Sequence, residues 1–382
     1  MPDDLLVGLM SGTSMDAVDA VLVRIGSDDF ELLACYEHPM PSSLRERIHT
    51  LSHPGEQEIH GLGELDRELG EHFAEAVRTL LSQSSTSADR VRAIGSHGQT
   101  VRHHPPSVSL PGERAYTLQI GDPNTIAEST GITTVADFRR RDLAAGGEGA
   151  PLVPAFHDFL FANADKRRAV VNIGGIANAS LLLGGEVSGF DTGPGNTLLD
   201  HWILRHRGEH YDPLGAWSAE GEVNSSLLAA LSAHPYLALA PPKSTGKEAF
   251  NLDWLDEVLE SRPAVSPQDV QATLAEFTAV SIAESLAEFS LDDVYVCGGG
   301  ASNTDLMRRL YQRLSPVYLG TTTELGCDPA WVEASAFAWL AWRTLNGLPG
   351  NVAAVTGASG PRVLGAIYPG ATAGNQSDRV VR

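Results

Sequence analysis

Two turns rich in glycine and hydroxyl groups, about half a chain apart, have the residue types that bind phosphate. The first turn, residues 12–19, reads GTSMDAVD and directly follows an apolar run. Glycine lets the backbone approach a ligand closely, and hydroxyls and successive N–H groups bind phosphate oxygens. We expect this loop to hold the β- and γ-phosphates of a nucleotide, with Asp16 or Asp19 orienting Mg²⁺ directly or through water. The candidate loop residues are Gly12, Thr13, Ser14, Met15, Asp16, Ala17, Val18 and Asp19.

The second turn lies in AVVNIGGIANASLLL, residues 169–183, and is followed closely by GFDTGPGN, residues 189–196. Each hairpin alone is also typical of an ordinary tight turn between buried strands. Their repetition favours a two-sided clamp on a nucleotide. A later glycine run, residues 298–300, could accept an adenine or ribose, although a simple strand-to-helix turn explains it equally well. The second-half candidates for nucleotide binding are Gly174, Gly175, Gly193, Gly195, Asn196, Gly298, Gly299 and Gly300.

Two carboxylates stand in contexts that suggest chemistry. Asp191 ends a predicted strand directly before a loop with two glycines, where a carboxylate more often faces a cleft than a core. A helix-capping role is the alternative, but Asn196 is better placed to cap the helix that follows. Glu333 lies in a helix that is apolar almost all round, so we expect it to pair with an arginine, a metal or a substrate hydroxyl. The alternative is that Glu333 lies beside Ser335 on one narrow, solvent-exposed face of this helix.

Further polar residues are candidates for contact with a substrate. His97, Gln99 and Asp122 lie at predicted strand ends, where they either touch substrate or fix a turn. Arg139 and Arg140 belong to a run of three arginines in an otherwise acidic chain. This run is either a cationic site for an anionic substrate group or a solvated face.

The elements that must position these residues predict an α/β fold with mixed sheets, because strands alternate with helices in both halves. A chain of 382 residues exceeds what one core usually fills, so we expect two domains, residues 1–165 and 166–382. The net charge of −21 argues against nucleic acid and anionic membranes as partners. No apolar run approaches the ~20 residues of a membrane span, and the N-terminus lacks signal-peptide features, so we expect a cytoplasmic protein. The cysteines show no metal-ligand spacing.

From about residue 5 to 368 the sequence resembles the anhydro-N-acetylmuramic acid kinases. The motifs that carry the resemblance are, in order, GLMSGTSMDAVD, GSHGQTVRHHP, LQIGDPNTIAE, VADFRRRDLAAGGEGAPLVPAFH, NIGGIAN, GFDTGPGNTLLD, KSTGKEAFN, DVQATLAEFTA, VCGGGASN and VTGA. One departure is Ala17, where the family usually has glycine. The resemblance implies a fold similar to actin, heat-shock chaperone ATPase domains and hexokinase. It would have two actin-like, ribonuclease H-like domains with mixed five-stranded sheets and an active site in the interdomain cleft.

The resemblance also implies a reaction. ATP would phosphorylate O6 of 1,6-anhydro-N-acetylmuramic acid while water opens the anhydro bridge at C1, in peptidoglycan recycling. Asp191 matches the base that activates the water, and residues 12–19 match the ATP phosphate loop. ATP and Mg²⁺ are the expected cofactors, and Asp16 and Glu333 are candidate metal ligands. Rival interpretations are a kinase of another anhydrosugar such as levoglucosan, or a non-metabolic actin-like ATPase. Monomer and homodimer both stay open.

Overall fold

The computed structural model describes residues 4–12, 15–27, 29–110, 112–241, 243–246 and 248–370. The chain divides into two compact units: unit 1 is Met1–Leu160 with Trp331–Arg382, and unit 2 is Phe161–Ala330. The predicted division at residue 165 is therefore close, but the assignment of everything after it to a second domain is wrong. The physical reason is that a helix and a strand from the C-terminal segment pack on the first sheet.

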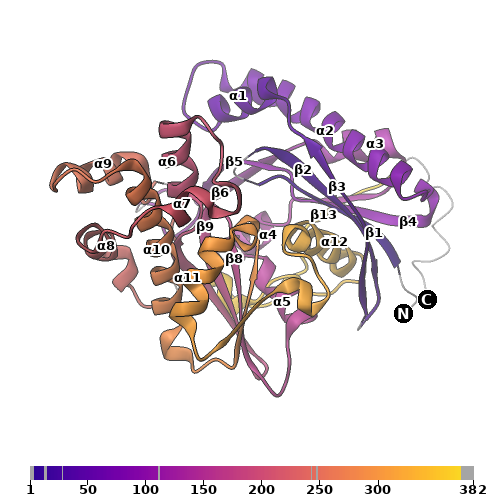
Figure 1. Ribbon diagram of the computed structural model, residues 1–382. Helices are drawn as coiled ribbons and strands as arrows, with labels where there is room; N and C mark the ends of the chain where they lie inside the picture. The colour runs from indigo at the N-terminus through magenta and orange to yellow at the C-terminus, as the bar shows by residue number, and fades with distance from the viewer. Residues whose placement is uncertain are drawn as a thin grey trace. The chain divides into compact units, whose positions relative to one another are not determined.

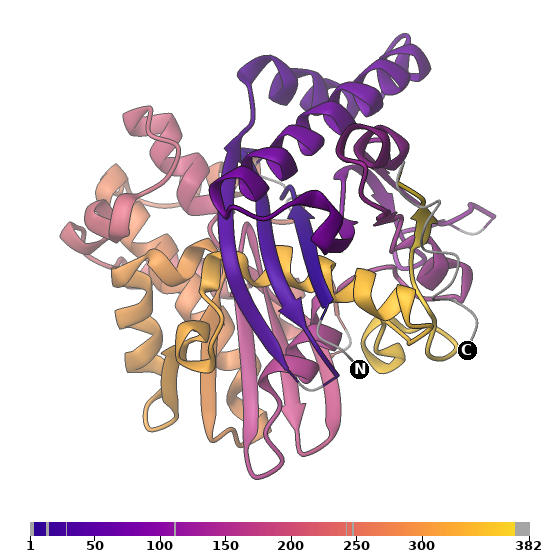
Figure 2. The ribbon, with the colours of Figure 1, turned by 90° about the vertical axis from the view of Figure 1, so that its right-hand side faces the viewer.

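Unit 1 is built on a six-stranded sheet. Its strands, in spatial order, are β13 (Ala366–Tyr368), β7 (Thr134–Ala136), β4 (Val91–Ser96), β1 (Asp4–Met10), β2 (Ala17–Ile25) and β3 (Phe30–Pro39). A separate hairpin joins β5 (Gln99–His104) to β6 (Tyr116–Ile120). The helices are α1 (Ser42–Leu51), α2 (Glu58–Gln83), α3 (Pro123–Thr130), α4 (Arg140–Ala144), α12 (Val332–Leu345) and α13 (Ala353–Thr356). The long strands β1, β2 and β3, coloured indigo, run side by side in Figure 2.

Helices α12 and α2 cover opposite faces of this sheet (Figure 1). Successive residues of β1 point to opposite faces, so neighbouring residues of this strand contact different helices. Val7 and Leu9 are fully buried in one cluster with Leu69 of α2. Gly8, between them, faces α12, and a Cβ there would collide with the backbone carbonyl of Ala334. The absence of a side chain at Gly8 therefore allows α12 to lie directly on the sheet.

Unit 2 contains a five-stranded sheet in the order β10 (Glu186–Pro194), β9 (Ile176–Leu183), β8 (Arg167–Ile173), β11 (Asp293–Cys297) and β12 (Tyr318–Thr321). Its helices are α6 (Thr197–Arg207), α7 (Ala216–Glu220), α8 (Ser225–Ser232), α9 (Leu252–Glu260), α10 (Pro267–Leu286) and α11 (Thr304–Leu314). Helix α5 (Val153–Phe161) ends at the boundary between the units. The sheet and helices α10 and α11 share one buried apolar cluster, while α6, α8 and α9 bury a second one against α10.

The two sheets have the same topology. In each, the first three strands form an antiparallel meander, and two later strands add in parallel beside the first. This duplicated order is that of the ribonuclease H-like, actin-like fold expected from the sequence. The first sheet departs from the expected five strands, because β13 adds antiparallel to its β7 edge. Both predicted hairpins are confirmed as β1–β2 and β8–β9. No helix among the described residues is long and apolar enough to cross a membrane.

Candidate active site

In unit 1, the loops after β1 and β4 are tied together by hydrogen bonds. The His97 N–H donates to the carbonyl of Leu9 (3.0 Å), and the Ser11 hydroxyl donates to Oε1 of Gln99 (2.7 Å). Ser11, His97 and Gln99 are all buried. These bonds bring the predicted phosphate loop to two of the predicted substrate residues, because the strands β1 and β4 are parallel neighbours.

Arg139 is the cation of this group. Its Nε (3.1 Å) and Nη2 (2.9 Å) donate to Nε2 of His97, and its Nη1 donates to the carbonyl of Gly149 (2.9 Å). Burial, followed by the charge of Arg139, holds the pKa of His97 well below its usual value, so the imidazole is neutral and accepts. Burial lowers the pKa of Arg139 to about 10, while Glu333 and Asp142 raise it. The guanidinium therefore remains charged at neutral pH.

Asp142 holds the segment that carries Arg139. Its carboxylate accepts hydrogen bonds from Gly149 N (2.9 Å), Asn351 Nδ2 (2.7 Å) and Thr356 Oγ1 (2.7 Å). The loop around residue 149 is thereby joined to the C-terminal part of unit 1. Because this carboxylate is fully buried and binds donors from three separate residues, we interpret Asp142 as a positioning group.

Two carboxyl groups of unit 1, Glu333 and Asp19, are destabilised as anions. Burial raises the pKa of Glu333, and the charge of Arg139 lowers it. Burial, then the charges of Glu37 and Glu333, raise the pKa of Asp19 to about 7. Glu333 therefore has the arginine near it that its apolar helix led us to expect. Asp19 and Glu333 repel each other, so a cation that neutralises them would be favoured.

Two residues of the predicted phosphate loop, Thr13 and Ser14, lie outside the described residues. The residues on either side of them are described. Met15 takes a positive φ of 58°, and its N–H donates to the Gly12 carbonyl (3.2 Å). Ala17 begins β2 and pairs with Pro39, so its methyl group stands on extended backbone where glycine is not needed.

Three residues of unit 1 that were predicted to bind a substrate, nucleotide or metal make ion pairs or hydrogen bonds with other residues of the protein. Asp16 is exposed and pairs with Arg45 (3.2 Å), and exposed Arg140 pairs with Asp137 (3.3 Å). Asp122 caps α3: its oxygens accept from Asn124 N and Thr125 N, each at 3.0 Å. Burial raises the pKa of Asp122, but these bonds lower it on balance. Of the two interpretations given for Asp122, the turn-fixing one agrees with its geometry.

In unit 2, Asp191 lies within β10 at a bulge, where the pairing with β9 shifts between Asp191 and Gly193. Bulges redirect side chains, and they recur near active sites. Oδ2 of Asp191 accepts from the Ser244 hydroxyl (2.8 Å) and the Thr245 N–H (2.9 Å). The Tyr236 hydroxyl donates to its backbone carbonyl (2.7 Å). Burial, the largest cause, raises the pKa of Asp191; the two hydrogen bonds lower it and Glu248 raises it.

The three glycine segments of unit 2 meet at the ends of β8 and β11. The N–H groups of Gly195 and Asn196 donate to the carbonyls of Gly175 (2.9 Å) and Gly174 (2.8 Å). The Asn196 side chain donates to the Ile173 carbonyl (3.2 Å) and makes no cap bond to α6, contrary to the capping role expected for it. The N–H groups of Gly195 and Asn196 and the side-chain amide of Asn196 thus all donate to carbonyls of the protein. Contact of these residues with a nucleotide stays a prediction.

The run at residues 298–300 packs against the same strand end. Gly298 has a positive φ of 77°, and a Cβ there would collide with Oδ1 of Asn172. A Cβ on Gly300 would collide with Ile173, whereas the position of a Cβ on Gly299 has only Asn196 nearby, at 3.7 Å. Close packing therefore explains two of these glycines, and Gly299 is the one with room beside it.

Comparison with known proteins decides the family. The family model described as "AnmK: Anhydro-N-acetylmuramic acid kinase" matches residues 4–370. The chain belongs to the anhydro-N-acetylmuramic acid kinase family. The protein of that name from Pseudomonas paraeruginosa (strain DSM 24068 / PA7) is 53% identical over 366 residues, covering 95% of this chain and 98% of that protein. The one from Shewanella halifaxensis (strain HAW-EB4) is 51% identical over 97% of this chain and all of that protein.

Among solved structures, the activator of the 2-hydroxyisocaproyl-CoA dehydratase from Clostridium difficile with bound ADPNP aligns over 90% of this chain and 96% of that chain. Its TM-score is 0.46 and its sequence identity 11%.

The sequence alone did not identify two groups of residues that hold the candidate site residues Asp191 and Arg139 in place. Ser244 and Thr245 lie in the KSTGKEAFN motif, and no local signal in the sequence connects them to Asp191. Asp142 lies in the arginine-rich motif and was overlooked beside its charged neighbours. In both cases the partner is remote in sequence, and hydrophobic periodicity does not report polar contacts between loops.

Proposed function

We propose that this chain transfers the γ-phosphoryl group of ATP to O6 of 1,6-anhydro-N-acetylmuramic acid while water opens the anhydro bridge. The products are N-acetylmuramic acid 6-phosphate and ADP, and the role is in cell-wall recycling. Membership of the kinase family over residues 4–370 is the observation that carries this proposal. The half-buried Asp191, whose carboxylate accepts hydrogen bonds from Ser244 and Thr245, supports it as a candidate base.

The proposed reaction couples the attack of water on C1 to phosphoryl transfer onto O6. Asp191 accepts a proton from water, and the water oxygen forms a bond to C1 as the C1–O6 bond breaks. The electron pair left on O6 attacks the γ-phosphorus, and ADP leaves in line. The raised pKa of Asp191 fits a base that must accept a proton near neutral pH, because such a base is stronger than an exposed carboxylate.

Unit 1 offers the groups for the charged parts of the substrates. Three contacts of Arg139 to described residues use three of its five N–H groups, which leaves two for a carboxylate such as the lactyl group of muramic acid. Asp19 and Glu333 fit Mg²⁺, which prefers carboxylate oxygens, because their mutual repulsion would be relieved by a divalent cation. Bound Mg²⁺ would screen the negative charge of the ATP phosphates. Asp16 is a weaker candidate, since Arg45 already pairs with it.

A coupled assay of ADP release with anhydro-N-acetylmuramic acid, with levoglucosan and without sugar tests the proposal. We expect turnover only with the muramic sugar. Preference for levoglucosan would identify the rival anhydrosugar kinase, and sugar-independent turnover would identify the rival ATPase. In ¹⁸O water the transferred phosphate should carry no label, whereas ATP hydrolysis would place ¹⁸O in inorganic phosphate.

A further inference from the structure

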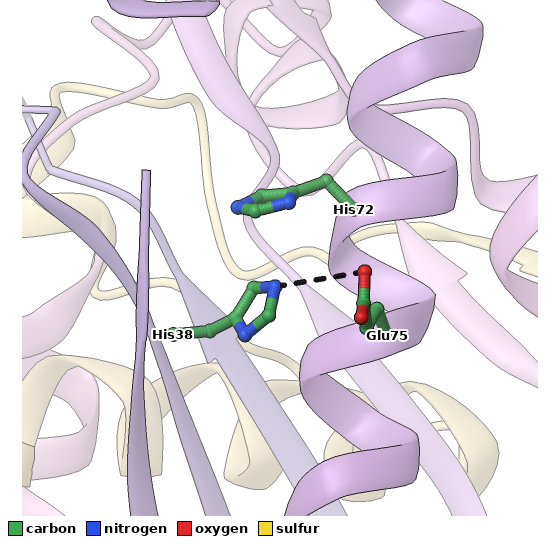
Figure 3. A group of neighbouring side chains, drawn as sticks. All are labelled: His38, His72 and Glu75. Carbon is green, nitrogen blue, oxygen red and sulfur yellow. Dashed lines mark ion pairs between the residues drawn. The ribbon is translucent and has the colours of Figure 1, made fainter. Parts of the chain in front are cut away.

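Two histidines and a glutamate of unit 1 lie close together between β3 and α2 (Figure 3). His38 comes from the end of β3, and His72 and Glu75 lie three residues apart on α2, so their side chains share one helix face. The potential ligand atoms all lie within 4.8 Å of one another, and Nε2 of His38 is 4.0 Å from Oε2 of Glu75. Among the described residues this is the one group of three such side chains with that spacing.

Each histidine also has a hydrogen-bonding partner outside this group. His72 makes a hydrogen bond with the backbone of Pro39, which can only accept, so His72 donates one ring N–H there. The Tyr36 hydroxyl lies 3.2 Å from Nδ1 of His38. Metal-binding histidines are typically fixed in this way through the ring nitrogen that does not bind the metal.

Two buried ring nitrogens of this group have no hydrogen-bond partner among the described residues. They are Nε2 of His38 and Nε2 of His72. A buried polar atom without a partner costs about 1–3 kcal/mol, so two such atoms within one group of potential ligands favour a bound ion. Burial lowers the pKa of both histidines, which keeps the rings in the neutral form that binds metals.

We propose that His38, His72 and Glu75 bind one divalent transition-metal ion of the Zn²⁺ class. Two imidazoles and one carboxylate with a fourth position open to water are a known type of zinc ligand set. Zinc bonds to these atoms are roughly 2.0–2.2 Å long, so the donors must close in by about an ångström from their present spacing. The Glu75 side chain is 62% exposed and free to make most of that movement.

This site differs in chemistry from the proposed Mg²⁺ position at Asp19 and Glu333. Imidazole nitrogens suit Zn²⁺, Ni²⁺ and Cu²⁺, whereas Mg²⁺ takes oxygen ligands. The metal would fasten β3, an outer strand of the sheet, to α2. It should therefore stabilise the fold increasingly as free Zn²⁺ rises above its dissociation constant, and it should not be needed for phosphoryl transfer.

Zinc binding to the full chain, stripped with a chelator and kept in excess Mg²⁺, tests this site. His49 and His53 form an exposed pair on or just after α1 with ring centroids 4.8 Å apart, so both are first changed to glutamine to remove a competing site. In this background we expect one Zn²⁺ per chain by equilibrium dialysis. Co²⁺ should give the intense visible absorption of a four- or five-coordinate ion.

Three variants in that background decide the outcome. Glu75→Gln keeps the fold because its side chain is exposed, and it should weaken Zn²⁺ binding by at least about tenfold, as should His38→Asn. His60→Gln is the matched control, because His60 lies on the same helix with Glu64 at 3.5 Å but has no third ligand. Equal Zn²⁺ affinity in the parent and Glu75→Gln, or no bound Zn²⁺ in the parent, would overturn the proposal.

Discussion

Asp191 is subject to opposing effects within its own surroundings. Burial and Glu248 oppose its ionisation, whereas the Ser244 hydroxyl and the Thr245 N–H stabilise the charged form. The balance is a raised pKa, with one carboxylate oxygen held by two donors. A proton acceptor with a fixed orientation and raised basicity is what water activation requires.

Asp191→Asn should lower kcat by about 10²- to 10⁴-fold and leave ATP binding nearly intact, because an amide keeps the shape but cannot take a proton. Steady-state kinetics and nucleotide binding measure the two effects. Asp253→Asn, an exposed aspartate in the first turn of α9, is the matched control. A variant that keeps more than about a tenth of the activity would remove Asp191 from the role of base.

Arg139→Ala should raise KM for the muramic sugar by about 10- to 150-fold, which corresponds to the 1.5–3 kcal/mol of a charge-assisted hydrogen bond. Arg140→Ala should change it little, because Arg140 is exposed and pairs with Asp137.

A sugar whose lactyl carboxylate is replaced by an amide separates binding from misfolding. Wild-type enzyme should lose affinity for the amide, while Arg139→Ala should bind both sugars equally. If the variant still prefers the carboxylate, Arg139 does not bind it.

Asp19→Asn should change how stability depends on pH. The folded-state pKa of about 7 lies above the unfolded value of 3.8, so the folded state holds the proton more tightly between these values. Stability due to Asp19 is therefore present below pH 3.8 and lost as pH rises toward 7. The asparagine variant should gain on wild type across that window, by up to about 4 kcal/mol. Urea unfolding at pH 4 to 8 measures the difference; parallel curves would contradict it.

At the scale of elements, local patterns predicted the two hairpins but not the distant elements that pack on their sheets. The β1–β2 and β8–β9 hairpins follow from apolar runs and turn residues. The place of α12 on the first sheet does not, because Gly8 and Ala334 are far apart in sequence and glycine in a strand has several explanations. A long-range close approach leaves no periodic signal in either segment.

Gly8→Ala should destabilise unit 1 by about 1–3 kcal/mol or more, since the added methyl group meets the Ala334 carbonyl and α12 must move away. Denaturant unfolding measures the loss, and activity should fall with it because Glu333 moves with the helix. Gly63→Ala in α2 is the control: no atom lies near its added Cβ, so a neutral or slightly stabilising effect is expected. Equal stability of Gly8→Ala and Gly63→Ala would contradict the tight packing.

At the scale of the whole molecule, the sequence was sufficient to predict the α/β class, the duplication and the family. It was not sufficient to predict which unit owns the C-terminal segment. The predicted second domain, residues 166–382, assumed that domains follow one another along the chain. Unit 2 is instead enclosed in sequence by the two parts of unit 1. The roles of Asp191 and Arg139 in the candidate site stay predictions, and backbone contacts such as those of Gly195 leave no signal in the sequence.

Residues 161–330 expressed alone should fold, because they contain a complete sheet and two buried clusters. Residues 1–160 alone should not, because they lack α12 and β13. Joining residues 331–370 to them through a glycine–serine linker should restore a cooperative melt, observed by circular dichroism. Cooperative folding of residues 1–160 without that segment would contradict the division.

The split of unit 1 along the chain imposes an order on biosynthesis. When the ribosome has made residue 160, the face of β1 that receives α12 has no cover, because that helix has not been translated. Unit 2 must be synthesised first, which takes roughly 10–35 s at typical bacterial elongation rates. The unit that is encoded second can therefore be the first to complete its fold, and the nascent first sheet must meanwhile avoid aggregation.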